Sequence, residues 1–334
     1  MKRENPDLYA ALLLGILLHT LLCAQARYGA RAGLLALPFS AAALTLAAVL
    51  FARAWRQLEG LRAPRWGLAA VLAASSAFEL LRFWQLIQTA YGGAVTMLGV
   101  CLMLLLPVVY LRRVSAIAQT ANVVLSLAAV AGVVLLISIA GELRPANLQP
   151  GDPGQAGWRQ ALLWQCSLYP EFLLPALWPD PDKRGPHTAA RLAVCGTVFS
   201  AVVHLILELY AGAGARLLPV PVHTAAQAGT LSLFKRLEWL QLILWSMMVT
   251  VKLALYLYAA VRLLGGRGNK KENNAVGLDR FPCYFLLMAF LCAAWRKADT
   301  ETFFVWQSNL LWLFAAAVIL GGGLQYLCGR KKRC

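Results

Sequence analysis

Long apolar runs alternate with short polar segments along the whole chain of 334 residues. Most runs approach the roughly 20 residues that a helix needs to cross a bilayer, and the roughly ten-residue alternation of a transmembrane β-barrel is absent from the sequence. The pattern therefore predicts an all-α polytopic membrane protein with ten transmembrane helices. We expect these helices over residues 8–24, 33–51, 67–90, 94–111, 117–140, 160–178, 188–211, 238–261, 281–295 and 302–328.

The composition supports this prediction. The chain is 60% hydrophobic and 14% charged, with a mean hydropathy of +0.62, whereas a soluble domain is about a quarter charged. The formal net charge of +16 could suggest nucleic acid as a partner. Because the positive charges lie in short segments beside the apolar runs, we interpret them as topological charge that also attracts anionic membrane lipid, with no nucleic acid bound.

The distribution of Lys and Arg predicts the orientation, because cytoplasmic loops are enriched in them. With the N-terminus inside, 20 of these residues fall on the cytoplasmic side and 9 on the outer side. Both termini are then cytoplasmic, which requires an even number of spans. No small-residue cleavage motif follows the first apolar run, so we expect that run to stay in the mature protein rather than to be removed as a signal peptide.

The sequence carries no recognisable catalytic motif. GxSxG, HExxH and phosphate-loop patterns are all absent, and the eight cysteines stand singly, without CxxC or Cys/His metal spacing. We therefore expect neither an enzyme nor a bound metal or cofactor, and we expect the cysteines to be small apolar residues within the helices.

Ten spans divide naturally into two sets of five with opposite orientation. The halves would comprise about residues 1–140 and 158–334, joined by an outer loop over 141–157, and the whole chain would be one membrane domain. Many secondary transporters have such inverted repeats, and the first helix of each half is broken near the membrane midplane to form the substrate site. We accordingly predict a five-plus-five inverted repeat with broken first and sixth helices.

The sixth expected helix contains the stretch CSLYPEFLLPALWP, residues 166–179. Pro170 and Pro175 each remove a helical hydrogen bond, and Glu171 lies beside the first break, so a small polar ligand could bind there. The alternative is a simple kink with Glu171 near the headgroups or paired internally. In the first expected helix only Gly15 and His19 interrupt the apolar run, and His19 fits a bundle-facing histidine better than a proton carrier.

Two further expected helices carry charges at membrane depth, where ionisable residues usually face a bundle interior. Glu79 and Arg82 in the third are three residues apart and can pair, either to line a cavity or to fix helix packing. In the eighth, Gln241, Trp245 and Lys252 recur at helical spacing. Lys252 either snorkels to the interface, which we favour, or places its ammonium where transporters of this plan hold a coupling cation.

Three stretches resemble the spore germination permease family, the B subunits of nutrient germinant receptors. They are FKRLEWLQLILWSMMVTVKLALYLYAA, LYPEFLLPALWP and VVYLRRVSAIAQTANVVLSLAA, and the similarity extends over most of the chain from about residue 94. This family belongs to the amino acid–polyamine–organocation superfamily. The resemblance implies that fold, an amino-acid-like ligand, partner A and lipoprotein C subunits, and a place in the bacterial inner membrane, namely that of the spore.

The hypothesis is thus a receptor subunit that binds a germinant and signals to its partners, and the alternative is an ion-coupled transporter of an amino acid or organocation. We expect the ammonium of the ligand at Glu171 and its carboxylate at the exposed N–H groups of the half-helix. Lys252 is the candidate for coupling or gating. The predicted ligand-binding residues are Gly15, His19, Glu79, Arg82, Tyr169, Pro170, Glu171 and Trp245.

Overall fold

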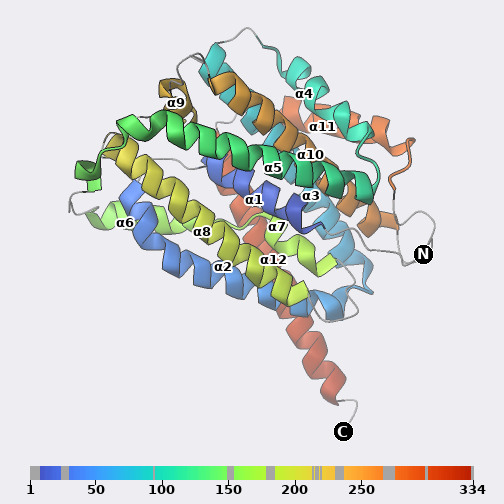
Figure 1. The fold of residues 1–334 in the computed structure, drawn as a ribbon. Coiled ribbons are helices and arrows are strands. Elements are labelled where there is room, and N and C mark those ends of the chain that lie inside the picture. Colours follow the sequence, from blue (N-terminus) through green and yellow to red (C-terminus); the bar gives the residue numbers. More distant parts are fainter. Residues whose placement is uncertain are drawn as a thin grey trace, which may run out of the picture.

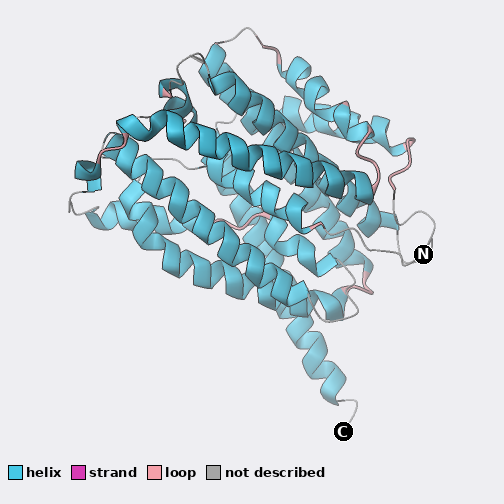
Figure 2. Cartoon of the chain, viewed as in Figure 1, coloured by secondary structure: helices cyan, strands magenta, loops and turns pink. Residues whose placement is uncertain are grey.

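The structure is a computed structural model of the full chain, and it is helical throughout the part that it describes (Figure 2). In that part no β-strand is present, and a single isolated β-bridge joins Arg113 to Ala275. The described residues are 8–23, 30–92, 95–148, 154–177, 185–212, 214, 218, 220–229, 237–265, 275–297 and 300–331.

Twelve α-helices and four short 3-10 helices make up the described chain. The α-helices are α1 Tyr9–Cys23, α2 Ala30–Leu58, α3 Arg62–Tyr91, α4 Met97–Leu105, α5 Val114–Ile139, α6 Gly154–Gln165, α7 Pro170–Leu173, α8 Gly185–Ala211, α9 Pro221–Ala228, α10 Leu237–Gly265, α11 Arg280–Trp295 and α12 Thr300–Lys331. The 3-10 helices are η2 Pro107–Val109, η3 Ala140–Glu142, η4 Pro145–Leu148 and η5 Leu174–Leu177.

The described residues of the ten expected spans are largely helical, but the sixth is broken and the fourth contains only α4 and the short η2. Six helices are long and apolar enough to cross a membrane, while α1, α4 with η2, and α11 are shorter apolar helices. The six long spans are Ala32–Leu58, Arg62–Thr89, Val114–Glu142, Gly185–Ala211, Trp239–Gly265 and Thr302–Cys328. The chain is therefore a polytopic helical membrane protein.

Helix α1 lies inside the bundle and packs against α5, α8 and α10 (Figure 1). Its side chains Leu14, Ile16 and Leu18 are all buried. On one side of α1, α8 packs along α2, which also contacts α12; on the other side, α10 packs along α3. This arrangement brings α1, α3, α10 and α12 within reach of the segment that follows α6.

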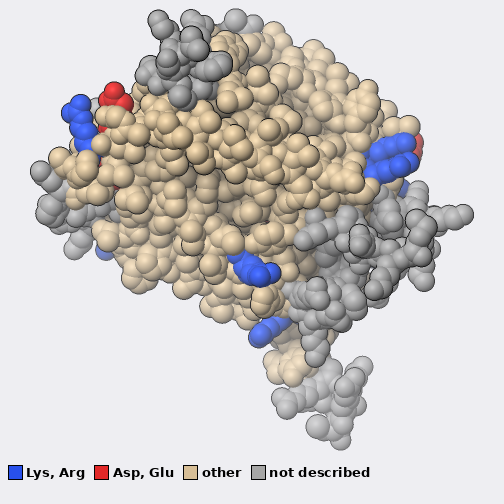
Figure 3. Space-filling model, viewed as in Figure 1, with Lys and Arg blue, Asp and Glu red and all other residues tan. Residues whose placement is uncertain are grey.

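The long helices differ greatly in how much of their surface the protein covers. The apolar span of α10 is 83% buried, whereas that of α5 is 11% buried and exposes Val123, Val130 and Ile137. The face drawn in Figure 3 is largely free of charged side chains, which gather toward its edges. A helix such as α5 buries its apolar residues against lipid instead of protein, as an integral membrane protein requires.

Candidate functional site

The sixth expected helix is broken where the prolines predict. Helix α6 ends at Gln165, the backbone of Tyr169 is extended (φ −116°, ψ 156°), and α7 begins at Pro170. A residue before proline disfavours the helical region, while proline itself suits the first position of a new helix, where no N–H is needed. The carbonyl oxygen of Cys166 accepts a hydrogen bond from the Trp312 indole at 2.9 Å. The break is thus stabilised by protein contacts.

This break directs Glu171 into the bundle, where it meets Lys252 and Tyr256 of α10. Glu171 is fully buried, and its Oε1 lies 3.2 Å from Lys252 Nζ and 2.8 Å from the Tyr256 hydroxyl, which donates to it. Both partners come from one face of α10, because they are four residues apart. Of the two forms of the alternative, a position near the headgroups is wrong, whereas internal pairing of Glu171 is what the structure shows.

Lys252 also pairs with Glu79 of α3, so that it lies between two carboxylates. Its Nζ is 2.9 Å from Glu79 Oε1, and its side chain is completely buried. The favoured expectation that Lys252 snorkels to the interface is therefore wrong. Two buried anions in the middle of the bundle offset the desolvation of an inward-facing ammonium, which an apolar helix face could not do.

Arg82 completes the charge balance. Its Nη1 lies 3.6 Å from Glu79 Oε1, as the three-residue spacing predicts. The same nitrogen lies 3.3 Å from His19 Nδ1, and Nη2 donates to Gln307 Oε1 of α12. Two carboxylates therefore face two cations. We call the group formed by His19, Glu79, Arg82, Glu171, Lys252, Tyr256 and Gln307 the polar cluster.

The hydrogen-bonding roles within the polar cluster follow from Arg82, which can only donate. His19 Nδ1 must then be an acceptor, which leaves the neutral ring with its proton on Nε2. Among the described residues, His19 Nε2, Gln307 Nε2, Glu79 Oε2 and Glu171 Oε2 have no hydrogen-bond partner of good geometry, although the Gln307 amide lies beside the Glu79 carboxylate. The polar cluster thus presents unused donors around Arg82 and unused acceptors around Lys252.

Gly15 has a different role from the one that the sequence predicts. Helix α1 is continuous from Tyr9 to Cys23, so the expected break in the first helix is wrong. A Cβ atom at Gly15 would overlap the carboxylate of Glu171, and glycine is needed because the Glu171 side chain packs directly against α1 at this position. One turn later, the ring of His19 lies 3.6 Å from that of Tyr169, so the break also packs against α1.

The structure thus gathers eight of the nine predicted site residues around the polar cluster, and it places Trp245 elsewhere. Trp245 lines a separate apolar cavity two turns from Lys252 along α10. Tyr256 and Gln307 are not among the residues that the sequence predicts. The position of Tyr256 four residues after Lys252 was a usable signal, and Gln307 begins the polar triplet Gln307-Ser308-Asn309 within α12.

The polar cluster is the candidate ligand site, with balanced charge and five helices contributing side chains. In the described part of the chain, no group of three or more His, Cys, Asp or Glu residues could hold a metal ion. Six cysteines are free thiols, namely Cys101, Cys166, Cys195, Cys283, Cys292 and Cys328. No protein-family model matches the chain, and no curated protein matches it significantly.

Proposed function

We propose that this chain is a membrane subunit that binds a small amino-acid-like molecule at the polar cluster. The observation that carries the proposal is that the polar cluster holds both hydrogen-bond donors and hydrogen-bond acceptors without partners. The free donors of His19 and Gln307 suit a carboxylate, and the free oxygens of Glu79 and Glu171 suit an ammonium. A zwitterion would supply hydrogen-bond partners for both sets, and leaving buried polar groups without such partners costs free energy.

The proposal gives Lys252 a definite part in binding. Its ammonium lies 3.2 Å from Glu171 Oε1, so the ammonium of a ligand at the unused Glu171 Oε2 would compete with Lys252 for the same carboxylate. Binding would shift Lys252 from Glu171 toward Glu79, which already accepts from it at 2.9 Å. The network of charges would remain neutral because the ligand is a zwitterion. A change in the position of Lys252 could then be transmitted along α10.

The fold that we propose is two inverted sets of five helices with the ligand at the broken sixth helix. Support comes from the six long apolar helices and three shorter ones at the expected positions, and from the break between Gln165 and Pro170. The uninterrupted α1 means that only one of the two expected breaks is present. In place of a second break, α1 has Gly15, which leaves room for the Glu171 side chain against the helix.

On the basis of the sequence resemblance, we propose that the chain acts as the B subunit of a spore nutrient germinant receptor. It would bind a germinant in the spore inner membrane and signal to an A subunit and a lipoprotein C subunit. A sensor needs two states that differ in ligand affinity. Movement of Lys252 from Glu171 toward Glu79 on ligand binding would be the structural difference between them.

The second candidate function is an ion-coupled transporter of an amino acid or organocation. The specific observation in its favour is the buried ammonium of Lys252 between two carboxylates. Such a group could alternate between charged and neutral forms, or replace a metal cation, during a transport cycle.

Uptake and binding together test the proposal. The purified chain in lipid nanodiscs is screened with a pool of labelled amino acids, and proteoliposomes are assayed for uptake with and without proton and sodium gradients. Saturable binding without uptake is the expected result for a receptor subunit. Accumulation driven by a gradient would establish the transporter, and folded protein that binds no amino acid would overturn the proposed ligand class.

A further inference from the structure

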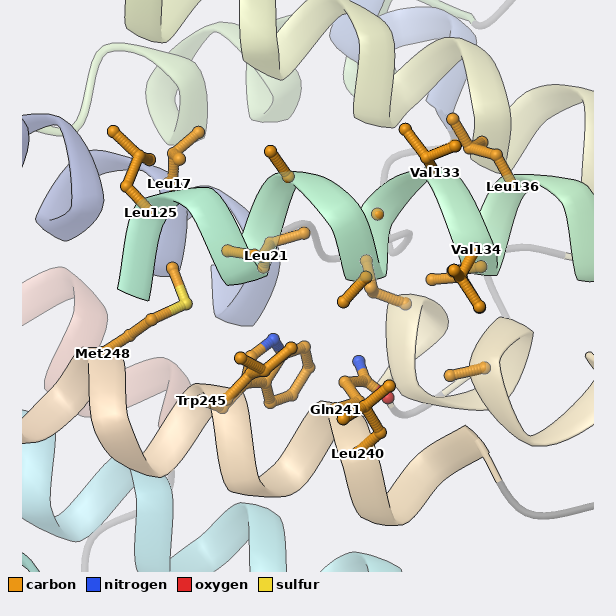
Figure 4. Close-up of a pocket in the computed structure, with 18 of the residues that line it drawn as sticks. Leu17, Leu21, Leu125, Val133, Val134, Leu136, Leu240, Gln241, Trp245 and Met248 are labelled. Carbon is orange, nitrogen blue, oxygen red and sulfur yellow. The ribbon is translucent and has the colours of Figure 1, made fainter. Parts of the chain in front are cut away.

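A cavity of about 410 Å³ lies between α1, α5 and α10, away from the polar cluster (Figure 4). Its volume is in the range of ligand pockets. Leu17 and Leu21 of α1 face it, whereas Gly15 and His19 of the same helix face the polar cluster. Helix α1 therefore separates the two regions.

The cavity has the elongated shape of a hydrocarbon chain. Its lining extends from Leu240 to Met248 on α10 and from Leu125 to Leu136 on α5, which at the helical rise corresponds to about 12 and about 16 Å. The two helices run antiparallel along it, with Leu125 opposite Met248 and Val134 toward Gln241 (Figure 4). We call this cavity the apolar slot.

The apolar slot opens toward the lipid-facing surface. Val133, Leu136 and Leu240 line it and are also exposed on the outside of the bundle, by 57%, 37% and 44%. Helix α5 forms this rim, and its span is the least covered by protein of the six. A molecule could therefore enter directly from the hydrocarbon of the bilayer.

One end of the apolar slot is polar, and its hydrogen-bonding direction is fixed. The Gln227 amide donates to His223 Nε2 at 3.2 Å, so the proton of His223 is on Nδ1, which donates to Gln241 Oε1 at 3.3 Å. Gln241 Nε2 is buried without a hydrogen-bond partner among the described residues. The unpaired Gln241 amide is therefore a hydrogen-bond donor at this end of the slot, and a bound molecule would need an oxygen acceptor there.

The depth of Gln241 indicates where that acceptor lies. Gln241 is in the second turn of α10, close to Trp239, whose ring is 4.9 Å from that of Tyr91 at the end of α3. Aromatic residues at helix ends mark the headgroup level of a membrane. The ester carbonyls of glycerolipids lie just below that level.

We propose that the apolar slot binds one acyl chain of a membrane glycerophospholipid, whose ester carbonyl accepts a hydrogen bond from Gln241 Nε2. The chain extends past Trp245 to Met248 and fills the space between α5 and α10. This site is independent of the proposed amino-acid function, because it involves none of the residues of the polar cluster.

Photolabelling in proteoliposomes tests the site. The full-length protein is reconstituted with a phosphatidylglycerol that carries a diazirine near the end of one acyl chain, irradiated, digested and mapped by mass spectrometry. We expect label on the α10 peptide around Trp245 and Met248, above the level on the lipid-facing α12 peptides. Equal labelling of both would overturn the proposal.

Two glycine variants make the test specific. A Cβ atom at Gly132, which lines the slot, and one at Gly323 on α12 would each meet open space, so neither substitution by leucine should disturb the fold. Gly132→Leu should reduce slot labelling to the level of the α12 peptides, and Gly323→Leu should leave it unchanged. An unchanged label in Gly132→Leu would contradict occupation of the slot.

A third variant tests the ester contact. Gln241→Leu replaces the amide by an apolar side chain, which removes the donor together with the oxygen that accepts from His223. We expect slot labelling to fall about fivefold, as for the loss of one neutral hydrogen bond to the lipid. Undiminished labelling, or displacement of the lipid by a small excess of an alkane with no oxygen, would contradict recognition through an acceptor. Amino-acid binding serves as the separate readout for the polar cluster and should not change in any of these variants.

Discussion

The polar cluster and the apolar slot lie on the same two helices and have opposite chemistry. On α1, Gly15 and His19 face the cluster and Leu17 faces the slot; on α10, Lys252 faces the cluster and Trp245 the slot. The cluster is closed and charged, and each charge has an opposite partner within 3.6 Å. The slot is open and apolar. On α1 the two regions occupy different faces, whereas on α10 Trp245 and Lys252 share one face two turns apart. The helices packed around each region therefore determine what it can bind.

The largest expected effect comes from removing Lys252. Lys252→Met leaves Glu79 and Glu171 buried without their shared ammonium, and breaking a buried ion pair in this way costs about 3–5 kcal/mol. The free energy of unfolding, measured by titration with sodium dodecyl sulfate in mixed micelles, should fall by that amount. Pairing Lys252→Met with Glu171→Gln should recover part of the loss. Wild-type stability in Lys252→Met would show that the ion pairs do not hold the bundle together.

Gly15→Ala should have the next largest effect. The new methyl group would overlap the Glu171 carboxylate, and overpacking of this kind costs about 1–3 kcal/mol. Gly323→Ala is the matched control, since its methyl group meets open space and should change the unfolding free energy by no more than about 1 kcal/mol. Equal effects of the two substitutions would contradict the close approach of α1 and α7.

Tyr256→Phe isolates a single hydrogen bond. It removes the hydroxyl that donates to Glu171 Oε1 at 2.8 Å, and loss of a hydrogen bond to a charged group costs about 1.5 kcal/mol or somewhat more. Tyr326→Phe, at a position 56% exposed on α12, provides the control in the same unfolding titration. A change no larger than that of the control would mean that Tyr256 does not support Glu171.

The smallest effect is expected in the apolar slot. Gly132→Ala adds a methyl group that meets no atom within 4 Å, and replacing a helical glycine by alanine stabilises by up to about 1 kcal/mol. The same unfolding titration should therefore show a small gain for Gly132→Ala. A clear loss of stability would mean that the space beside Gly132 is filled by protein, and the slot would not exist as described.

The sequence predicts much of the fold because each helix has its own apolar run, and the physical rules for those runs are local. The prolines likewise indicate the break before α7, and the spacing of Glu79 and Arg82 indicates their pairing. These features need no knowledge of which helices are neighbours.

The parts that the sequence could not predict depend on contacts between distant helices. Lys252 faces inward because Glu79 and Glu171 arrive from α3 and α7, and neither neighbour can be inferred from α10 alone. Gly15 likewise looks like a break until Glu171 is seen against it. Gln307 joins through Arg82 at a separation of 225 residues. Trp245, which shares a helix face with Lys252, lines the slot because α5 and α1 shape the space beside it.

The decisive experiment for a ligand site at the polar cluster is equilibrium binding of labelled amino acids to the wild-type protein and to Glu171→Gln. The substitution keeps an acceptor for the Tyr256 hydroxyl and removes the charge that would bind the ammonium of a ligand. With folding verified for both proteins, the account predicts that affinity falls by at least about tenfold, as expected for the loss of one charge-assisted hydrogen bond. Equal affinity in the two proteins would contradict a ligand site at the polar cluster.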